Sequence, residues 1–346
     1  MKVALIVVLV LLSACCLAAD KPGYWVVTNT EQLMKAASKV TPAGGTIVLR
    51  PGNYVIEKTL VFDGMRLLNI EGGGWSTQIH RSGEGDAIVF KDSAFCVVRN
   101  LLIAGDPKAK TGSAIHYQGQ SSSCTIDFCR LTGFAESGVR YTGDTKSPMS
   151  SNTIRDCHFI DNRGHQLWSV SNNDFYIDGN QFGDGTVGSK TGCLLDRSSA
   201  GTYTRNYHWG NVNAFKMLRS HFNRIENNRF ENSRETGVII GEPNGEACQL
   251  DIFIGNTVHT NSEAASGKFA AMEAYNAHDI TFCDNQVFSW NSASVKHKSS
   301  LVLDDKCMHW IIKDNIFRHN VGPALVYSEK GGHIVKDNQM DPQESP

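Results

Sequence analysis

The sequence lacks an excess of charge of either sign. Its 33 lysine and arginine residues nearly balance its 35 aspartate and glutamate residues, so the net charge is −2 and the isoelectric point is about 6.6. No global basic field therefore exists that would attract nucleic acid or a membrane surface. Binding of a polyanion would need a local patch of basic side chains.

The motifs of several enzyme and metal-binding classes are also missing. No two cysteines have the C-x-x-C spacing of a structural zinc site. The glycine-rich stretches 83–88 and 182–190 lack the strand-to-helix context of a phosphate-binding loop or a dinucleotide-binding fold. A Ser-His-Asp signature is not found either, so the function must be sought in the organisation of the whole chain.

Residues 1–19 form the only apolar run that resembles a targeting segment. The run has one lysine near its start and small residues at its end, and it is too short for a comfortable membrane span. We interpret it as a secretory signal peptide that is cleaved after Ala18 or Ala19. The alternative is a lipoprotein, because Leu12–Cys15 resembles a bacterial lipobox that would leave a lipidated Cys15. Both alternatives predict an extracytoplasmic protein that is secreted, periplasmic or held at the cell surface.

A repeated pattern of an apolar residue, a small polar corner and an aromatic or apolar residue runs through most of the chain. The stretch 223–241, NRIENNRFENSRETGVIIG, shows it most clearly. Ten such segments follow one another at intervals of 21 to 30 residues, which is the period of a solenoid. The residues predicted to share the corner column are Leu101, Cys129, Cys157, Asn180, Tyr207, Asn228, Thr257, Asn285, Asn315 and Asn338.

A second short strand follows each corner, as in residues 137–141 (SGVRY) and 214–218 (AFKML). The coils leave no room for a helix between strands, and they are too short for the four strands of a propeller blade. We therefore predict an all-β fold, a single right-handed parallel β-helix of about ten to twelve coils over residues 44–340. Residues 20–43 are predicted to form a linker and an N-terminal capping helix, and residues 341–346 a disordered tail.

The capping helix is predicted to run from Thr28 to about Val40. Thr28 and Glu31 have the spacing of a capping box, and Leu33, Ala36 and Val40 fall on one helical face. Such a helix would cover the hydrophobic open end of a β-helix and block association through its edge.

Two pairs of cysteines are each separated by one coil. Cys96 and Cys124 are 28 residues apart, as are Cys129 and Cys157. An exported protein can bridge such pairs, but neighbouring parallel strands hold side chains that point the same way at a separation near the lower limit for a disulfide. We favour free thiols buried in the ladder over disulfides.

The order of helix, AGGTIVLRPGNYVI (43–56), LLNIEGGG (67–74) and asparagine-bearing coils resembles the pectin-lyase-like superfamily of right-handed β-helix proteins. The resemblance covers about residues 24–340. It implies the fold and a substrate groove along the sheet of second strands, but the superfamily includes lyases, hydrolases, epimerases and proteins without known activity. The signature motifs of pectin methylesterases, polygalacturonases and mannuronan epimerases are absent.

Alternation along the second strands predicts which side chains face this groove. With Ile115, Val139, Met217, Met272 and Leu303 inward, the outward set includes ionisable residues from several neighbouring coils. The candidate substrate-binding residues are His116, Arg140, Asp196, Glu273, Tyr275 and Trp290.

β-Elimination on a uronate-containing glycan is the leading hypothesis. This reaction needs a base for the C5 proton and a cation that neutralises the adjacent carboxylate. The superfamily's alginate lyases and chondroitinase B use a lysine and an arginine on adjacent coils, which implies Lys216 as the base and Arg197 or Arg219 as the carboxylate clamp. His165 is the other catalytic candidate. Some of those lyases use calcium, for which Glu242, Glu273 and Asp304 would be ligands.

Two alternatives stay open. Hydrolysis needs two carboxylates at a defined separation, and Glu273 with Asp304, or with Glu242, lies on neighbouring coils. The second alternative is a polysaccharide-binding or surface protein without catalysis, in which polar and aromatic residues would spread evenly along the groove. In each case we expect a monomer with a polysaccharide as its partner.

Overall fold

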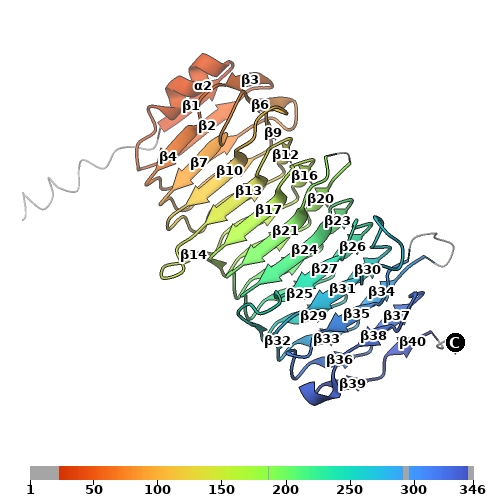
Figure 1. The fold of residues 1–346 in the computed structure, drawn as a ribbon. Coiled ribbons are helices and arrows are strands. Elements are labelled where there is room, and N and C mark those ends of the chain that lie inside the picture. The colour runs from red at the N-terminus through yellow and green to blue at the C-terminus, as the bar shows by residue number, and fades with distance from the viewer. Residues whose placement is uncertain (1–22, 186, 291–295, 342–346) are drawn as a thin grey trace, which may run out of the picture.

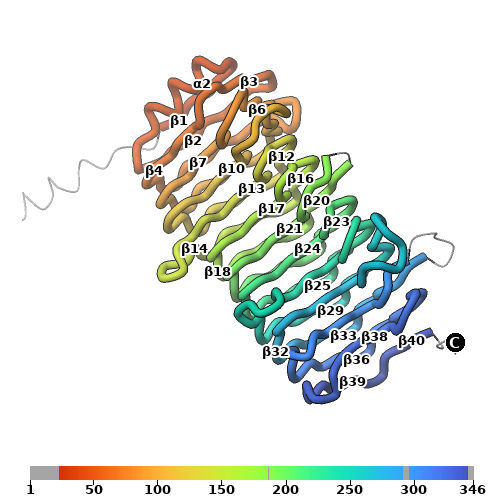
Figure 2. The backbone as a smooth tube through the Cα atoms, in the orientation of Figure 1, coloured from red at the N-terminus to blue at the C-terminus, as the bar shows by residue number. Residues whose placement is uncertain are grey.

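The chain forms one elongated parallel β-helix of about twelve coils (Figure 1). The computed structural model describes residues 23–185, 187–290 and 296–341. The predicted signal peptide, the lipobox with Cys15 and most of the predicted tail lie outside the described residues. Each coil contributes one strand to each of three parallel sheets, and the tube in Figure 2 shows the coils stacked along a single axis.

The three sheets are named here in the order in which the chain visits them. Sheet I has 13 strands: β1 Gly23–Val27, β2 Gly45–Leu49, β5 Leu68–Glu71, β8 Val97–Arg99, β11 Thr125–Asp127, β15 Thr153–Arg155, β19 Tyr176–Asp178, β22 Thr202–Thr204, β25 Arg224–Glu226, β29 Ile252–Ile254, β33 Thr281–Cys283, β36 Ile311–Lys313 and β39 Ile334–Lys336. Sheet II has 12 strands: β3 Gly52–Ile56, β6 Thr77–Arg81, β9 Leu102–Ala104, β12 Arg130–Thr132, β16 His158–Ile160, β20 Gln181–Gly183, β23 Tyr207–Trp209, β26 Arg229–Glu231, β30 Thr257–His259, β34 Gln286–Phe288, β37 Ile316–Arg318 and β40 Gln339–Met340. Sheet III has 11 strands: β4 Leu60–Asp63, β7 Ile88–Lys91, β10 Ser113–Gln118, β13 Ser137–Thr142, β17 His165–Val170, β21 Thr191–Asp196, β24 Asn213–Leu218, β27 Val238–Ile240, β31 Met272–Ala274, β35 Leu301–Leu303 and β38 Leu325–Val326.

Smaller elements complete the coils. Two pairs of very short strands lie at the corner between sheets III and I, and one 3-10 helix precedes the last coil. These elements are β14 Met149–Ser150, β18 Asn172–Asn173, β28 Cys248–Gln249, β32 Ala277–His278 and η1 Glu329–Gly331.

Helix α2 (Thr30–Ala37) covers the N-terminal end of the solenoid, as predicted, and contacts strands β1 to β4 (Figure 1). Its start differs from the prediction. The side chain of Asn29, rather than that of Thr28, caps the helix by accepting a hydrogen bond from the backbone N–H of Gln32 at 2.9 Å. The side chain of Gln32 in turn accepts from the backbone N–H of Thr28 at 2.9 Å. Asn29 and Gln32 therefore cap the start of the helix, with Gln32 bonding to Thr28 rather than back to Asn29, and Thr28 and Glu31 do not form the predicted capping box.

An asparagine ladder closes the two-residue corner between sheets I and II. The side-chain oxygen of each asparagine accepts from the backbone N–H of its neighbour one coil earlier, at 2.9 to 3.0 Å, from Asn180 to Asn338. The predicted column is wrong in two coils, where Asn206 and Asn256 occupy the ladder in place of Tyr207 and Thr257. The error is one residue, because both coils contain an asparagine directly before the predicted position and a short strand alone does not specify its register.

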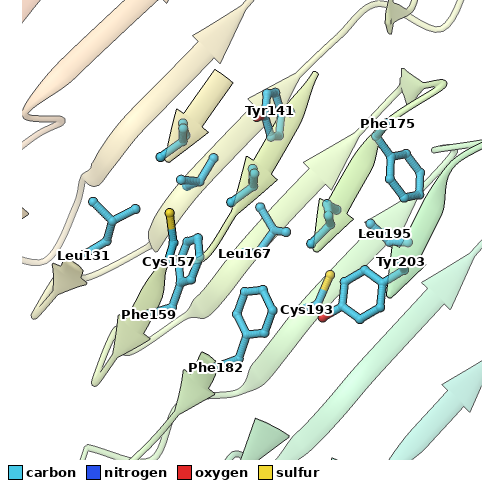
Figure 3. Close-up of a cluster of buried hydrophobic side chains, with 14 of the residues drawn as sticks. Leu131, Tyr141, Cys157, Phe159, Leu167, Phe175, Phe182, Cys193, Leu195 and Tyr203 are labelled. Carbon is cyan, nitrogen blue, oxygen red and sulfur yellow. The ribbon is translucent and has the colours of Figure 1, made fainter. Parts of the chain in front are cut away.

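Inward side chains stack coil upon coil to form the core. In sheet II, Phe159 and Phe182 lie with ring centroids 4.7 Å apart (Figure 3). Tyr117 and Tyr141 of sheet III lie with ring centroids 5.0 Å apart. The eight described cysteines are free thiols and seven of them are buried, which is the favoured alternative. Burial raises the pKa of the Cys157 thiol well above its ordinary value, so this thiol stays protonated and packs as a small apolar group.

The predicted alternation along sheet III is confirmed. Ile115, Val139, Met217 and Met272 are all buried, and Leu303 is 4% exposed. Because the side-chain period of a strand is two residues, their neighbours face outward. Sheet III therefore presents a continuous outer surface on which side chains from successive coils lie in columns.

Candidate active site

The central outward column of sheet III brings together residues that are far apart in the sequence. Strand pairing places His116 beside Arg140, Arg140 beside Trp168, and Trp168 beside Leu194. The same column continues through Lys216, Ile239 and Glu273. Adjacent strands are about 4.8 Å apart, so these side chains line one face at regular steps.

Lys216 projects from the middle of β24 and is half-buried. Its ammonium group has no hydrogen bond or ion pair with any residue that the structure describes. Desolvation lowers the pKa of Lys216, and the nearby carboxylates of Glu235 and Glu273 only partly oppose this effect. A lysine in this setting is closer than usual to the neutral amine that can accept a proton.

His165 lies at the start of β17, near Lys216. Burial, together with the positive charges of Lys190, Lys216 and Arg140, lowers the pKa of His165 to about 4. Its Nδ1 atom is buried and has no hydrogen-bond partner in the described chain. The imidazole is therefore neutral at ordinary pH, among three cationic side chains.

Arg140 and Trp168 form the next layer of this surface. The guanidinium carbon of Arg140 lies 4.2 Å from the centroid of the Trp168 ring, and one of its nitrogens donates to Glu136 Oε2 at 3.1 Å. The His165 ring lies 5.2 Å from the same tryptophan. The tryptophan thus holds the guanidinium and the imidazole on one side of Lys216.

Glu273 and Tyr275 lie on the other side of Lys216, on strand β31 and directly after it. The Tyr275 hydroxyl donates to Glu273 Oε2 at 2.6 Å, and the Thr236 hydroxyl donates to Glu273 Oε1 at 3.0 Å. Burial and the Glu273 carboxylate raise the pKa of Tyr275. Tyr275 therefore keeps its proton and can donate it. We call Arg140, His165, Trp168, Lys216, Glu273 and Tyr275 the sheet III cluster.

Arg197 and Arg219 do not join this cluster. Arg219 lies three residues beyond Lys216, or about 10 Å along the strand, at the corner between sheets III and I. Its guanidinium makes two bonds to Asp196, at 2.7 and 2.6 Å, and an ion pair with Glu242 at 3.3 Å. Arg197 pairs with Glu246 at 3.3 Å. We call these five residues the corner network, and it lies beside a shallow cavity of about 220 Å³.

His116 forms hydrogen bonds with two neighbouring side chains on the outer face. It is 7% exposed. Its Nδ1 atom lies 2.9 Å from Asp86 Oδ2 and its Nε2 atom lies 3.0 Å from Thr142 Oγ1. Both ring nitrogens are thus engaged within the protein.

The three predicted calcium ligands are separated. Glu242 pairs with Arg219, Glu273 bonds to Tyr275, and Asp304 Oδ1 accepts backbone N–H groups at the turn after β35, including that of Cys307 at 3.1 Å. Within the described ranges, no group of three or more histidine, cysteine, aspartate or glutamate side chains could hold a metal ion.

Trp290 lies away from the sheet III cluster, in the loop that follows β34. It packs edge-on against Phe288 and His259, with centroid distances of 5.6 and 5.7 Å. Trp168, Lys190 and Glu235 were not among the site residues predicted from the sequence. Of these, only Trp168 could have been predicted, because it directly follows the inward Leu167 on a strand and alternation therefore places it outward. Lys190 and Glu235 lie in turns, where no alternation indicates the direction of a side chain.

A model of the family described as "Periplasmic copper-binding protein (NosD)" matches residues 76–282, which is more than half of the 346-residue chain. No curated protein sequence matches the chain. Among the residues that the structure describes, no helix has both the length and the apolar character needed to cross a membrane.

Several solved structures share this fold at low sequence identity. The A-module of mannuronan C-5 epimerase AlgE6 from Azotobacter vinelandii is 15% identical with a TM-score of 0.60, and the match covers 91% of this chain and 95% of that one. An alginate lyase from Paenibacillus sp. str. FPU-7 is 13% identical with a TM-score of 0.51, covering 91% and 99%. The periplasmic alginate epimerase AlgG is 14% identical with a TM-score of 0.57, covering 92% and 84%. At these identities the likeness establishes the pectin-lyase-like β-helix fold alone.

Proposed function

The chain belongs to the NosD family of β-helix proteins, and from this premise and the sheet III cluster we propose that it is an extracytoplasmic polysaccharide lyase. Its substrate would be a glycan that contains uronate residues, and its reaction β-elimination. Lys216 would act as the base, with Arg140 as the cation that meets the substrate carboxylate.

The single observation that carries this proposal is the state of Lys216. A half-buried lysine without an ion pair in the described chain has a lowered pKa, and on the same outward face it lies near the neutral imidazole of His165. Charged groups in a structural ladder are normally paired, as the corner network is. Unpaired, desolvated ionisable groups are typical of sites that perform proton transfer.

The reaction can be written with these residues. The substrate carboxylate is held by Arg140, which lowers the pKa of the neighbouring C5–H bond. Neutral Lys216 accepts the C5 proton, and the electron pair of that bond forms a C4=C5 double bond as the C4–O bond of the glycosidic linkage breaks. Tyr275 donates the proton that the departing oxygen requires. His165 stays neutral and orients the uronate by hydrogen bonding.

Arg197 and Arg219 take a different role in this proposal. Arg219 engages Asp196 and Glu242 with all three of its guanidinium nitrogens, and Arg197 is shared between Asp196 and Glu246. Arg140 also has a carboxylate partner, Glu136, but it bonds to Glu136 through one nitrogen only, which leaves another for a substrate carboxylate. Arg197 and Arg219 would border the groove and leave the clamp to Arg140. Glu273 and Asp196, two of the predicted substrate-binding residues, would accept hydrogen bonds only from hydroxyl groups of the glycan.

Metal chemistry does not enter the mechanism. The family description names copper, but the described residues contain no group of histidine, cysteine and carboxylate side chains that could bind a copper ion. The cysteine thiols are mostly buried within the ladders. The residues present therefore do not fit the metal, and calcium likewise finds no carboxylate cluster.

The decisive assay follows ultraviolet absorbance while purified protein is mixed with alginate, pectate, hyaluronan and chondroitin. β-Elimination creates an unsaturated uronate that absorbs, whereas hydrolysis does not. We expect absorbance to rise with one of these substrates for the wild type and for Arg197→Met, but not for Lys216→Met. No rise in absorbance with any of the four acidic glycans would contradict the lyase proposal.

A hydrolase is the second candidate, because two carboxylates lie near Lys216. Glu235 and Glu273 both raise the pKa of Lys216 by their charge, so they flank the same space. Hydrolysis would use them as acid and base. New reducing ends without ultraviolet absorbance, lost in Glu273→Gln, would favour this candidate over the lyase.

A further inference from the structure

The corner between sheets I and II is built differently in one coil. Elsewhere this corner consists of two residues, for example Asn100 and Leu101 between β8 and β9. Between β5 and β6 it has five residues, 72–76. Hydrogen bonds hold this longer corner in place, since Gly74 N–H donates to Asn100 O at 2.8 Å and Gly73 N–H donates to Thr77 Oγ1 at 2.9 Å.

Trp75 lies in this longer corner, just before β6, on the outer side of the sheet II strands. The indole ring lies edge-on to His158, three coils further along, with a centroid distance of 4.8 Å. The guanidinium carbon of Arg130, two coils along, lies 5.6 Å from the ring centroid. Even so, Trp75 is 39% exposed. Trp75 thus forms one wall of a cavity of about 430 Å³ whose other walls come from four coils.

Phe128 is the second aromatic residue that lines the cavity. It is 55% exposed and has a φ of 49°, a left-handed conformation that bulky residues adopt at a cost. The equivalent corner positions in the neighbouring coils are Asn100, Asp156 and Gly179, which are residue types suited to that conformation. An exposed phenylalanine at this position brings no burial that would offset the strain.

Polar groups complete the lining. The side chains of Asn100, Asp156 and His158 line the cavity, and none of them has a hydrogen bond or ion pair with the described part of the chain. At Gly179 an added Cβ would come within 2.8 Å of Asp156 Oδ1, so the absence of a side chain there leaves the carboxylate accessible. The site combines two aromatic side chains with solvent-accessible polar groups that have no partner in the described part of the chain.

We propose that this cavity is a second glycan-binding site, specific for neutral sugar rings. A pyranose ring presents apolar C–H faces that stack on aromatic side chains and a rim of hydroxyl groups that bond to carboxylate, amide and imidazole. The Asp156 carboxylate would repel the carboxylate of a uronate, so neutral sugars are preferred. The volume lies within the range of roughly 300–1,000 Å³ typical of small-ligand sites.

The site lies on a different flank of the solenoid from the sheet III cluster. It sits at the corner of sheets I and II, whereas the proposed catalysis occurs on sheet III (Figure 1). A sugar bound there would not be cleaved, but it would keep the protein attached to a glycan matrix and raise the local concentration of substrate. This inference does not depend on the lyase proposal.

Calorimetric titration of the full chain with cellohexaose, mannohexaose and xylohexaose tests the proposal, with a mannuronate hexasaccharide as the acidic comparison. We expect at least one neutral hexasaccharide to bind, and Trp75→Ala and Phe128→Asn each to weaken that binding at least tenfold. Asparagine is favoured at the left-handed position, so Phe128→Asn should keep or raise Tm and cannot lose binding through unfolding.

Two matched controls exist in the chain. Trp290 is 55% exposed, and Phe222 is 61% exposed with a φ of 61°. Trp290→Ala and Phe222→Asn should bind the sugar as the wild type does, and so should Lys216→Met, which separates this site from the proposed active site. No binding of any neutral hexasaccharide, wild-type affinity in Trp75→Ala, or selective binding of the acidic hexasaccharide would each overturn the proposal.

Discussion

Two groups of charged side chains lie along strand β24, three residues apart, and they differ in how their charges are balanced. In the corner network, Arg219 holds Asp196 with two bonds of 2.7 and 2.6 Å and also reaches Glu242. In the sheet III cluster, Lys216 has no such partner among the described residues, and desolvation lowers its pKa.

This difference separates charges that stabilise from charges that are available for chemistry. Breaking a half-buried, fully bonded ion pair leaves an unsatisfied charge and costs stability. Removing an unpaired, desolvated ammonium group relieves a desolvation penalty and costs nothing in pairing. Residue type alone would rank lysine and arginine equally as catalytic candidates, whereas their surroundings do not.

The largest expected effect is on catalysis by Lys216→Met. If Lys216 is the base, the variant should lose about 10²- to 10⁴-fold in kcat, while its free energy of unfolding stays unchanged or rises. Ultraviolet kinetics and urea denaturation measure the two quantities. A variant that loses stability but keeps its activity would reverse the comparison between the two groups.

The next largest effect is a fall in the free energy of unfolding at acid pH, caused by His165 of the sheet III cluster. The pKa of His165 falls from its ordinary value of 6.5 to about 4 on folding, so only the unfolded chain takes up this proton between those pH values. Stability is therefore complete above pH 6.5 and is lost as pH falls towards 4, with a slope of at most about 1.4 kcal/mol per pH unit for this group.

Replacing the histidine tests this origin. His165→Gln should flatten the decline of stability between pH 6.5 and 4, as measured by urea denaturation at a series of pH values. Buried His208 and His297 also have lowered pKa values, of about 3 and about 4, so some acid sensitivity should persist in the variant.

Arg219→Met should show the opposite behaviour to Lys216→Met. It leaves Asp196 with a side chain only 15% exposed and without its main partner, and we expect a loss of about 2 kcal/mol in the free energy of unfolding. The kcat should change little. A large loss of kcat with unchanged stability would return Arg219 to the role of carboxylate clamp.

The smallest effect is expected for Arg140→Lys. The charge is kept, but the planar group that stacks on Trp168 at 4.2 Å is lost, and an arginine–lysine exchange at a stacked site is not conservative. We expect KM for the acidic glycan to rise about tenfold, equivalent to about 1.4 kcal/mol, with a smaller change in kcat. An unchanged KM would remove Arg140 from the substrate site.

The sequence alone was sufficient to predict the coils, the capping helix and the inward residues of sheet III. These features follow from two periods that can be counted in the sequence: two residues along each strand, and 21 to 30 residues from one coil to the next. It was insufficient at Asn206 and Asn256, where two adjacent residues fitted the corner pattern and only hydrogen bonding between coils selected one.

The candidate site required the tertiary structure. Lys216, His165 and Arg140 come from three separate coils, and whether each charge is paired depends on turns whose lengths follow no period. Arg219 and Lys216 look alike in the sequence, but the register of the coils places Asp196 against one and no carboxylate within ion-pair distance of the other. Local alternation determines which way a side chain points; only the packing of coils determines what it meets there.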